Sequence, residues 1–289
     1  MSPLKTLLIS TLTITGFGVA ACSGNTVQAP DETAVEAINV AKSLGDVIAH
    51  PRRADDMARD KFRNPEATLE FFGLEPGQTV GEVWPGWYTK IIAPYLAENG
   101  GTYVAVLRQA EGNERAMKRN QAFIDAYVGQ DGYGDIQTAA FGSNPAPIAE
   151  PNSLDLLLSF RNVHNWMGGD YAEKAFSDFY DVLKPGGVLG IVEHRLPETA
   201  VQNPKGRTGY VQESYMESLA QKAGFEFVES SEVNANPKDT ADHPVGVWTL
   251  PPRSAVPKEG SPEADGFDAA LYKNIGESDR ATLKFRKPL

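Results

Sequence analysis

From about residue 79 onward, the chain alternates short apolar runs with longer stretches in which apolar residues recur every three to four positions. The short runs, rich in β-branched and aromatic residues, predict strands, and the longer stretches predict amphipathic helices. Strands and helices that alternate along a chain are typical of βαβ units. We therefore predict an α/β fold with a doubly wound, mostly parallel seven-stranded sheet that carries helices on both faces.

The clearest predicted strand is the almost unbroken apolar run of residues 154–160, which is expected at the centre of the sheet, buried on both faces. Asn99-Gly100-Gly101 and Lys184-Pro-Gly-Gly187 are stop signals behind two of the helices. The final strand is expected to run antiparallel to the strand before it. The predicted strands cover residues 79–83, 102–107, 136–141, 154–160, 188–193, 225–233 and 281–286, and the predicted helices among them cover residues 87–98, 113–127, 171–183 and 210–223.

Further helical segments precede the first strand and are expected to cover one edge of the sheet. The first carries an apolar face up to Leu44 and breaks near Gly45, and residues 54–62 form a charged helix. Asn64 is expected to cap a third helix that begins at Pro65. Between the last two strands, residues 234–278 are rich in Pro, Asp and Gly and predict a long loop excursion with one short strand at residues 245–250.

The N-terminus predicts export. After Lys5, residues 6–21 are uncharged and largely apolar but too short for a membrane span, as in a signal peptide. The run ends in Val19-Ala20-Ala21-Cys22, which resembles the lipobox of bacterial lipoproteins, and this resemblance implies that Cys22 becomes the lipid-bearing first residue. Cys22 is the only cysteine, so it has no disulfide partner. An ordinary signal peptide with an incidental cysteine is the alternative.

The predicted organisation is therefore a lipoprotein signal peptide at residues 1–21, a tether and N-terminal helix at residues 22–45, and an α/β domain at residues 46–289. We expect a protein of the bacterial cell envelope that is lipid-anchored and faces the periplasm. Ser23, directly after the cysteine, favours the outer membrane. Contact with the membrane is expected only through the lipid.

The charge balance argues against nucleic-acid partners. The formal net charge is −11 with a pI near 4.9, whereas a nucleic-acid binder needs a basic face that releases counterions. The partner expected instead is a small-molecule substrate.

Residues 79–91 read as a buried strand, a sharp Pro-Gly turn and the start of a helix, with Glu82 at the strand end. Doubly wound sheets bind nucleotides at such a turn. The order of elements, with Glu82-Val-Trp-Pro-Gly86 and Leu183-Lys-Pro-Gly-Gly187, resembles the class I S-adenosylmethionine-dependent methyltransferase fold. Phe71-Phe72-Gly73, Arg161-Asn-Val-His-Asn165 and Glu193-His194-Arg195 resemble one branch of it, the exported predicted methyltransferases of bacteria.

The resemblance implies S-adenosylmethionine as cofactor, with Glu82, Gly86 and Asn162 as cofactor-binding residues. In the general pattern, acid-x-Gly-x-Gly-x-Gly, missing side chains let backbone amides approach the ligand. Here Trp84 and Tyr88 replace the outer glycines, and only Gly86 remains. Two interpretations stay open: the turn binds the cofactor, or it merely joins a strand to a helix.

The second diagnostic of the family is an acid at the end of the second strand, which holds the ribose hydroxyls. That position falls at Leu107, and the neighbouring Arg108 suits a phosphate better than a ribose diol. Asp131 and Asp135, on the following loop, are possible substitutes.

Polar residues are dense where the fourth and fifth strands end, the edge where open α/β sheets place ligands. His164 and His194 are candidate general bases, and Arg161 or Arg195 is expected to orient an anionic substrate; the predicted catalytic residues are His164, His194 and Arg161. The predicted substrate-binding residues are Asn165, Glu193, Arg195 and Tyr210.

Two other interpretations of this polar cluster stay open. It can be a structural network that ties the strand ends to the flanking helices. It can also hold a metal, with His164, Glu193, His194 and the Asp242-His243 pair as ligands, although none of these sit at a helical metal-ligand spacing.

The leading hypothesis is an envelope-anchored, S-adenosylmethionine-dependent methyltransferase that acts on an unknown small substrate by direct displacement on the sulfonium methyl. The alternative is a degenerate, non-catalytic or cofactor-independent envelope lipoprotein of the same fold, which binds a small molecule or a protein partner. The altered glycine motif and the scarcity of S-adenosylmethionine expected outside the cytoplasm favour this alternative. A metal-dependent hydrolase is a third possibility.

Overall fold

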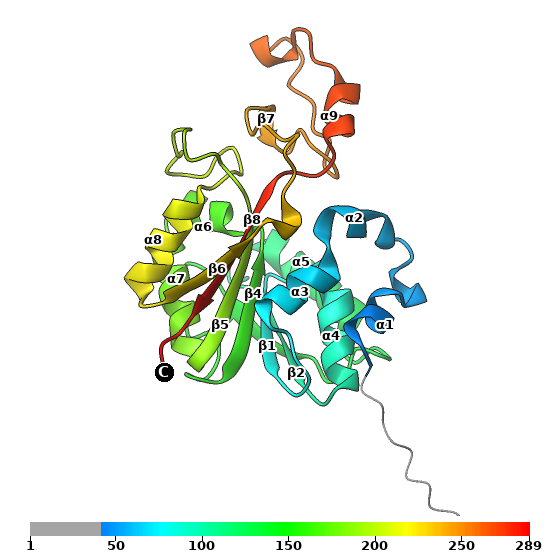
Figure 1. The fold of residues 1–289 in the computed structure, drawn as a ribbon, viewed down its shortest axis with the longest axis vertical. Coiled ribbons are helices and arrows are strands. Elements are labelled where there is room, and N and C mark those ends of the chain that lie inside the picture. Colours follow the sequence, from blue (N-terminus) through cyan, green and yellow to red (C-terminus); the bar gives the residue numbers. More distant parts are fainter. Residues whose placement is uncertain (1–41) are drawn as a thin grey trace, which may run out of the picture. The chain divides into compact units, whose positions relative to one another are not determined.

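The computed structural model describes residues 42–289. The predicted signal peptide, Cys22 and most of the tether and first helix therefore lie outside the described residues. The described chain is built on a seven-stranded sheet in the order β3-β2-β1-β4-β5-β8-β6 (Figure 1). Neighbouring strands are parallel except that β8 is antiparallel to both β5 and β6, which confirms the predicted fold class. The strands of the sheet are β1 (Thr79–Val83), β2 (Thr102–Arg108), β3 (Gln137–Phe141), β4 (Leu154–Phe160), β5 (Leu183–His194), β6 (Glu226–Ser231) and β8 (Arg280–Arg286).

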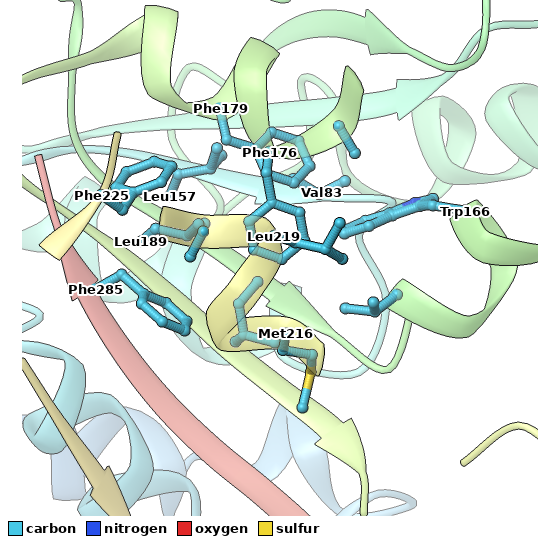
Figure 2. Packing of buried hydrophobic residues seen from close by; sticks show 14 of the residues in the cluster. Val83, Leu157, Trp166, Phe176, Phe179, Leu189, Met216, Leu219, Phe225 and Phe285 are labelled. Atoms are coloured by element: carbon cyan, nitrogen blue, oxygen red, sulfur yellow. The ribbon is translucent and has the colours of Figure 1, made fainter. Parts of the chain in front are cut away.

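Helices cover both faces of this sheet, and each face has its own apolar core. Helices α6, α7 and α8 pack over one face, where Leu157 of β4 belongs to the same core cluster as Trp166 of α6 and Phe176 of α7 (Figure 2). On the other face, Leu156 and Leu158 of the same strand belong to the core under α1, α3, α4 and α5. Side chains of β4 thus serve both cores, as expected of a central parallel strand. The helices are α1 (Leu44–Ile48), α2 (Asp60–Arg63), α3 (Pro65–Phe72), α4 (Thr89–Glu98), α5 (Glu114–Tyr127), α6 (Val163–Gly168), α7 (Ala172–Val182), α8 (Glu213–Ala223) and α9 (Ala269–Ile275), with short 3₁₀ turns η1 (Pro51–Arg53), η2 (Met57–Arg59), η3 (Glu232–Asn234) and η4 (Pro262–Ala264).

The N-terminal segments differ from their predictions. Gly45 does not end a helix but lies in the first turn of α1, which Ser43 caps by accepting a hydrogen bond from the Asp46 amide. Residues 54–62 do not form one helix, because η2 and the start of α2 divide them. Asn64 precedes α3 as predicted, but its backbone is left-handed and its side chain donates to the Val233 carbonyl instead of capping the helix.

The strand β5 begins earlier than predicted. It starts at Leu183, so Lys184-Pro-Gly-Gly187 lies inside the strand, next to a register shift against β4 between Leu154 and Leu156. Helix α6 directly follows β4 and was not predicted, because it has only six residues. Both features matter for the site, since α6 carries His164 and β5 ends at His194.

The excursion of residues 234–278 contains β7 (Pro244–Val247), which overlaps the short strand predicted at residues 245–250 and stays outside the seven-stranded sheet, and the unpredicted helix α9. In Figure 1 this segment, orange in colour, lies beyond the end of the sheet at which α6 begins. None of the helices within residues 42–289 combines the length and the apolar character that crossing a membrane requires.

Candidate functional site

A pocket of about 560 Å³ opens at the carboxyl ends of β1, β2, β4 and β5. The excursion supplies part of its wall, from Val247 to Arg253. Of the predicted site residues, Arg161, Asn162, His164, Asn165 and His194 line the pocket. The remaining predicted residues do not line it: Glu82, Gly86, Glu193, Arg195 and Tyr210.

The central polar unit is a carboxylate–imidazole pair. Glu193, fully buried on β5, has one carboxylate oxygen 3.1 Å from Nδ1 of His164, and the same oxygen accepts from the His194 amide. The other oxygen accepts from the His164 amide at the start of α6. An Nδ1–H pointing at this carboxylate leaves Nε2 of His164 as an acceptor, which lies 3.0 Å from the side-chain nitrogen of Asn165. The pair therefore presents a basic nitrogen toward the pocket, and Glu193 orients it without being able to reach a substrate.

The backbone around His164 is closely packed. Gly206 has a φ of 55°, and a side chain placed there would meet His164 atoms at 2.9–3.0 Å. Only glycine tolerates both the left-handed backbone and the close approach of His164 at this position. The loop that contains Gly206 therefore packs directly against the backbone and Cβ of His164.

His194 lies beside this unit, with its ring centroid 5.7 Å from that of His164. Its Nδ1 is 2.5 Å from the hydroxyl oxygen of Ser278. Burial, together with the nearby His164 and Arg161, lowers the pKa of His194 well below its usual value. The ring is therefore neutral at neutral pH and offers one hydrogen-bond donor and one acceptor without adding charge to the pocket.

Arg161 occupies a left-handed backbone position, with φ of 63°, directly after β4. Its amide donates to the Val192 carbonyl, which holds the turn against β5. Burial and the adjacent Arg280 lower the pKa of Arg161 to about 10. Among residues 42–289, its guanidinium, which lines the pocket, makes no hydrogen bond or salt bridge, and the nearby Glu277 carboxylate only partly offsets the effect of burial on its charge. A half-buried cation without a salt-bridge partner at this place favours an anionic ligand.

Asn162 connects two strands at the base of the pocket. Its side-chain nitrogen lies 3.1 Å from the Val83 carbonyl at the end of β1 and 3.3 Å from the Ser159 hydroxyl. The amide oxygen remains for a ligand.

Glu82 and Gly86 form a closed structural unit below the pocket. One Glu82 oxygen accepts from the Gly86 amide, and the other accepts from the hydroxyls of Thr89 and Tyr103 at 3.0 and 2.6 Å. Burial raises the pKa of Glu82 to about 6, against the opposing effect of these hydrogen bonds. The residue thus ties the turn to α4 and β2.

Replacing Glu82 by glutamine is expected to flatten the dependence of stability on pH. Because its folded-state pKa is raised above 4.5, the folded protein binds this proton more tightly than the unfolded chain, so stability falls as the pH rises from 4.5 through about 6. The effect amounts to about 2 kcal/mol. The free energy of unfolding by urea, measured across this pH range, checks it, with Glu70→Gln on exposed α3 surface as control. Equal slopes for wild type and Glu82→Gln would contradict the assignment.

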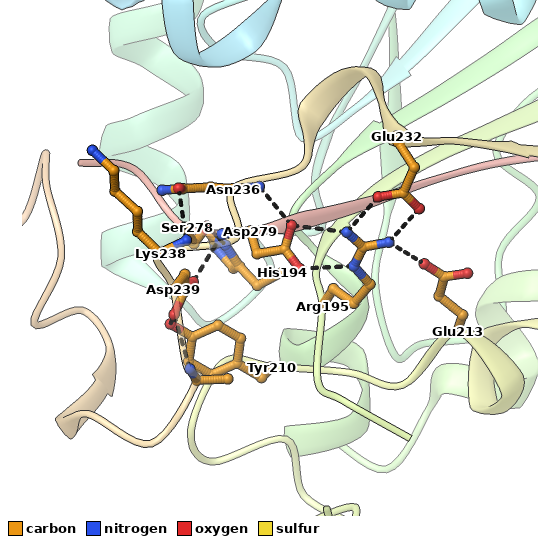
Figure 3. Close-up of polar contacts among 11 residues, drawn as sticks. His194, Arg195, Tyr210, Glu213, Glu232, Asn236, Lys238, Asp239, Ser278 and Asp279 are labelled. Carbon is orange, nitrogen blue, oxygen red and sulfur yellow. Dashed lines mark hydrogen bonds and ion pairs between the residues drawn. The ribbon is translucent and has the colours of Figure 1, made fainter. Parts of the chain in front are cut away.

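Arg195 and Tyr210, two predicted substrate ligands, instead belong to structural networks (Figure 3). The Arg195 guanidinium donates to three carboxylates, on Asp279, Glu232 and Glu213, which join β5 to β8, η3 and α8. The fully buried Tyr210 donates its hydroxyl to Asp239, which also contacts His243.

Two aromatic residues of the turn, Trp84 and Tyr88, occupy different places in the structure. Trp84, with φ of 52°, forms one wall of the pocket, and the Arg108 guanidinium stacks on its ring at 3.6 Å. Tyr88 is buried in the core, where it stacks on Phe160 at 3.8 Å and donates to the Arg63 carbonyl. The turn is therefore lined by aromatic rings on the pocket side and offers few free amides.

A second cavity of about 250 Å³ shares Trp84 and Arg108 with the pocket. It lies between the ends of β2 and β3, and Phe141, Tyr171 and Glu111 contribute to its wall. Glu111 is the one carboxylate among the described residues that line this cavity. Neither Asp131 nor Asp135 lines this cavity or the main pocket.

Sequence reasoning missed most of the charged lining. Besides Arg161 and Arg108, which the sequence had already singled out, the main pocket is lined by Arg115, Arg119, Arg253 and Arg280, and Glu277 is the only carboxylate among its lining residues within 42–289. Arg115 and Arg119 stand four residues apart on α5, so they share one helix face, and this spacing was the one available signal. Arg253 and Arg280 lie far along the chain, and no sequence pattern indicated that they reach the pocket.

The metal interpretation finds no support in the described part of the chain. No group of three or more His, Cys, Asp or Glu side chains within residues 42–289 is arranged to hold a metal ion. His243, one of the proposed ligands, is engaged with Asp239 at 2.7 Å.

The strand order and the single antiparallel strand define the class: a class I methyltransferase-like, Rossmann-like sheet. No family model matches the chain, and no curated protein matches its sequence. Among solved structures, it is similar to a SAM-dependent methyltransferase from Aquifex aeolicus, at 20% identity over 67% of this chain and 94% of the other, with a TM-score of 0.47.

Two further solved structures show the same likeness. A putative sarcosine dimethylglycine methyltransferase from Galdieria sulphuraria has 19% identity over 81% of this chain and 88% of the other, with a TM-score of 0.48. The [4+2]-cyclase SpnF has 19% identity over 78% of this chain and 80% of the other, with a TM-score of 0.49. These likenesses concern the fold alone, and a fold does not determine function, so the function of this chain has to be inferred from its own pocket.

Proposed function

We propose that the protein is an S-adenosylmethionine-dependent methyltransferase of the bacterial envelope, which methylates a small anionic acceptor in the pocket of about 560 Å³. The observation that supports it most is the Glu193–His164 pair beside the unpartnered Arg161, at the edge of the sheet where this fold binds ligands. A base next to an anion-binding group is what deprotonation of an anionic acceptor requires.

The second cavity is lined by side chains whose chemistry suits parts of the cofactor. Tyr171, partly exposed, offers aromatic surface for an adenine ring, and Glu111 offers a carboxylate for the ribose hydroxyls. Asn162 lines the main pocket, into which the methionine part would extend. When bound, S-adenosylmethionine supplies an electrophilic methyl group.

The acceptor is handled by the chain's own groups. Arg161 binds its anionic group and fixes its orientation. His164 takes a proton at Nε2, after the Asn165 side chain gives up its contact with that atom. Glu193 accepts the hydrogen bond from Nδ1–H of His164 and stabilises the positive charge that forms on the ring. Neutral His194 adds no repulsion to this charge.

The location in the envelope is the second part of the proposal. It is supported by the sequence Val19-Ala20-Ala21-Cys22, which fits export and lipid attachment at Cys22. This segment lies outside the described residues.

A second candidate function is binding of a small anion without methyl transfer. The specific observation in its favour is Trp84, whose ring stands at the position of the family's first glycine and carries Arg108 on its face. The next experiment separates the two candidates.

S-adenosylhomocysteine is expected to raise the melting temperature of the full-length, ligand-stripped chain, because a ligand that binds only the folded state stabilises it. Glu111→Ala is expected to weaken this binding about tenfold, as loss of a charge-assisted hydrogen bond does. Asp135→Ala, a carboxylate outside both cavities, serves as the matched control. If millimolar ligand gives neither a melting shift nor heat in a calorimeter, methyl transfer is excluded and the second candidate remains.

A further inference from the structure

We propose that the main pocket binds a polyanionic small molecule of the phosphate-ester class, held by two groups of arginines on either side of Trp84. This inference rests on the proposed function in one respect, that the pocket is where the acceptor binds. It does not require that methyl transfer takes place.

The first observation is the excess of positive charge in the pocket of a strongly acidic protein. The whole chain has a formal net charge of −11, whereas the pocket is lined by Arg108, Arg115, Arg119, Arg161, Arg253 and Arg280. The pocket's carboxylate, on Glu277, already pairs with Arg59, Arg63 and Arg280. Within the described residues, the guanidinium groups of the other five, Arg108, Arg115, Arg119, Arg161 and Arg253, form no hydrogen bond or salt bridge with another side chain.

The arginines fall into two groups along the edge of the sheet. Arg108 ends β2, and Arg115 and Arg119 follow on the first turns of α5. Arg161 follows β4, and Arg280 begins β8. Strands β2 and β4 flank β1, so the strand ends that carry Arg108 and Arg161 stand about 10 Å apart, two strand spacings, and β8 with Arg280 lies two strands beyond β4. Trp84, at the end of β1, lies between the two groups.

Exposed arginines are common on protein surfaces, and Arg115, Arg119 and Arg253 alone would mean little. Arg108 and Arg161 are different, because they are half-buried. Burial first, and nearby arginines second, lower the pKa of each to about 10. Holding two desolvated cations together is unfavourable unless an anion offsets their charge.

The chemistry of the lining favours phosphate. The pocket contains arginine but no lysine, and the planar guanidinium fork matches phosphate oxygens in pairs. Asn113 and Ala116, at the positive end of the 14-residue helix α5, line the same pocket. Trp84 and Trp248 provide apolar surface for the organic part of the ester. A volume of about 560 Å³ admits a molecule of nucleotide size.

A bound polyanion would also make the pocket compatible with a cationic cofactor. Uncompensated arginines repel a sulfonium, whereas an anion placed between them attracts it. The acceptor is therefore expected to bind before the methyl donor.

Calorimetric titration of the full-length chain with inorganic pyrophosphate, at low ionic strength and without S-adenosylmethionine, tests the inference. We expect one site per chain, with affinity that falls steeply as salt is added. Arg161→Ala is expected to weaken binding about tenfold or more, and the exposed pair Arg115→Ala/Arg119→Ala by a similar factor. Lys118→Ala is the matched control, because it removes a charge from the same helix without touching the pocket.

Absence of binding heat with both pyrophosphate and phosphate, or an equal loss in Lys118→Ala, would overturn the inference. The exposed α5 pair keeps the test valid if Arg161→Ala unfolds. The result is independent of the proposed function: pyrophosphate binding without S-adenosylhomocysteine binding would leave the anion site and exclude methyl transfer. S-adenosylhomocysteine binding without pyrophosphate binding would exclude the anion site and leave the proposed methyl transfer in place.

Discussion

Replacing Glu277 by glutamine is expected to lower the free energy of unfolding by about 3–5 kcal/mol, the loss typical of one partner removed from a buried ion pair. Its carboxylate receives Nε of Arg59 at 2.6 Å, Nε of Arg63 at 3.1 Å and a guanidinium nitrogen of Arg280. The side chains of Glu277 and Arg280 are each 3% exposed, and that of Arg63 is 2% exposed. Glutamine keeps the shape but leaves buried cations uncompensated.

The pH dependence of this effect follows from the same geometry. Burial tends to raise the pKa of Glu277, but the charges of Arg280 and Arg63 and the hydrogen bond from Arg59 outweigh it and hold the pKa below its usual value of 4.5. The carboxylate therefore stabilises the fold above pH 4.5, and this contribution disappears as the pH falls through the lowered pKa. The difference between wild type and Glu277→Gln should shrink in acid.

Urea unfolding at neutral and acid pH measures both quantities. Glu226→Gln is the control, because Glu226 pairs with Arg286 on the surface, with side chains 53% and 52% exposed. Such a pair contributes about 0–1 kcal/mol. A Glu277→Gln loss no larger than that of the control would show that the three arginines are compensated in another way.

Most of the sheet could be predicted from sequence, because buried parallel strands are apolar runs with turn signals behind them. The run of residues 154–160 coincides with β4, and residues 281–286 with all but the first residue of β8. Short helices such as α6 could not be predicted, since six residues carry less than two periods of a helical pattern. The start of β5 was misplaced because Pro185 and its glycines are ordinary helix-stop residues.

The sequence was enough to locate the candidate site but not to determine which of its side chains face the pocket. A sequence indicates that residues 161–165 and 193–195 reach the same edge of the sheet, and the structure places most of them on the pocket. It does not indicate the direction of each side chain beyond the alternation of a strand. Arg195 therefore looked like a substrate ligand, although carboxylates from three distant segments surround it. Which carboxylates pair with each arginine is determined only in the folded chain. The same holds for the pocket arginines that have no such partner.

Replacing His164 by glutamine is expected to lower the rate of methyl transfer about 10²–10⁴-fold, the usual contribution of a general base. Nε2 of His164 faces the pocket, and its Nδ1 is fixed by the buried Glu193 at 3.1 Å. Glutamine can retain a contact with Glu193 but cannot take up a proton. Formation of S-adenosylhomocysteine with a panel of phosphorylated alcohols and amines is the measurement.

The controls separate the role of this histidine as a base from its role in the structure. Pyrophosphate binding by His164→Gln should stay within about twofold of wild type, because the arginines are untouched. Glu193→Gln should lower the rate less than His164→Gln, since the ring remains and loses only its orienting partner. His243→Gln, a histidine outside the pocket that contacts Asp239, should leave the rate unchanged. A His164→Gln rate within tenfold of wild type would remove the base from the mechanism and leave Arg161 to act by positioning alone.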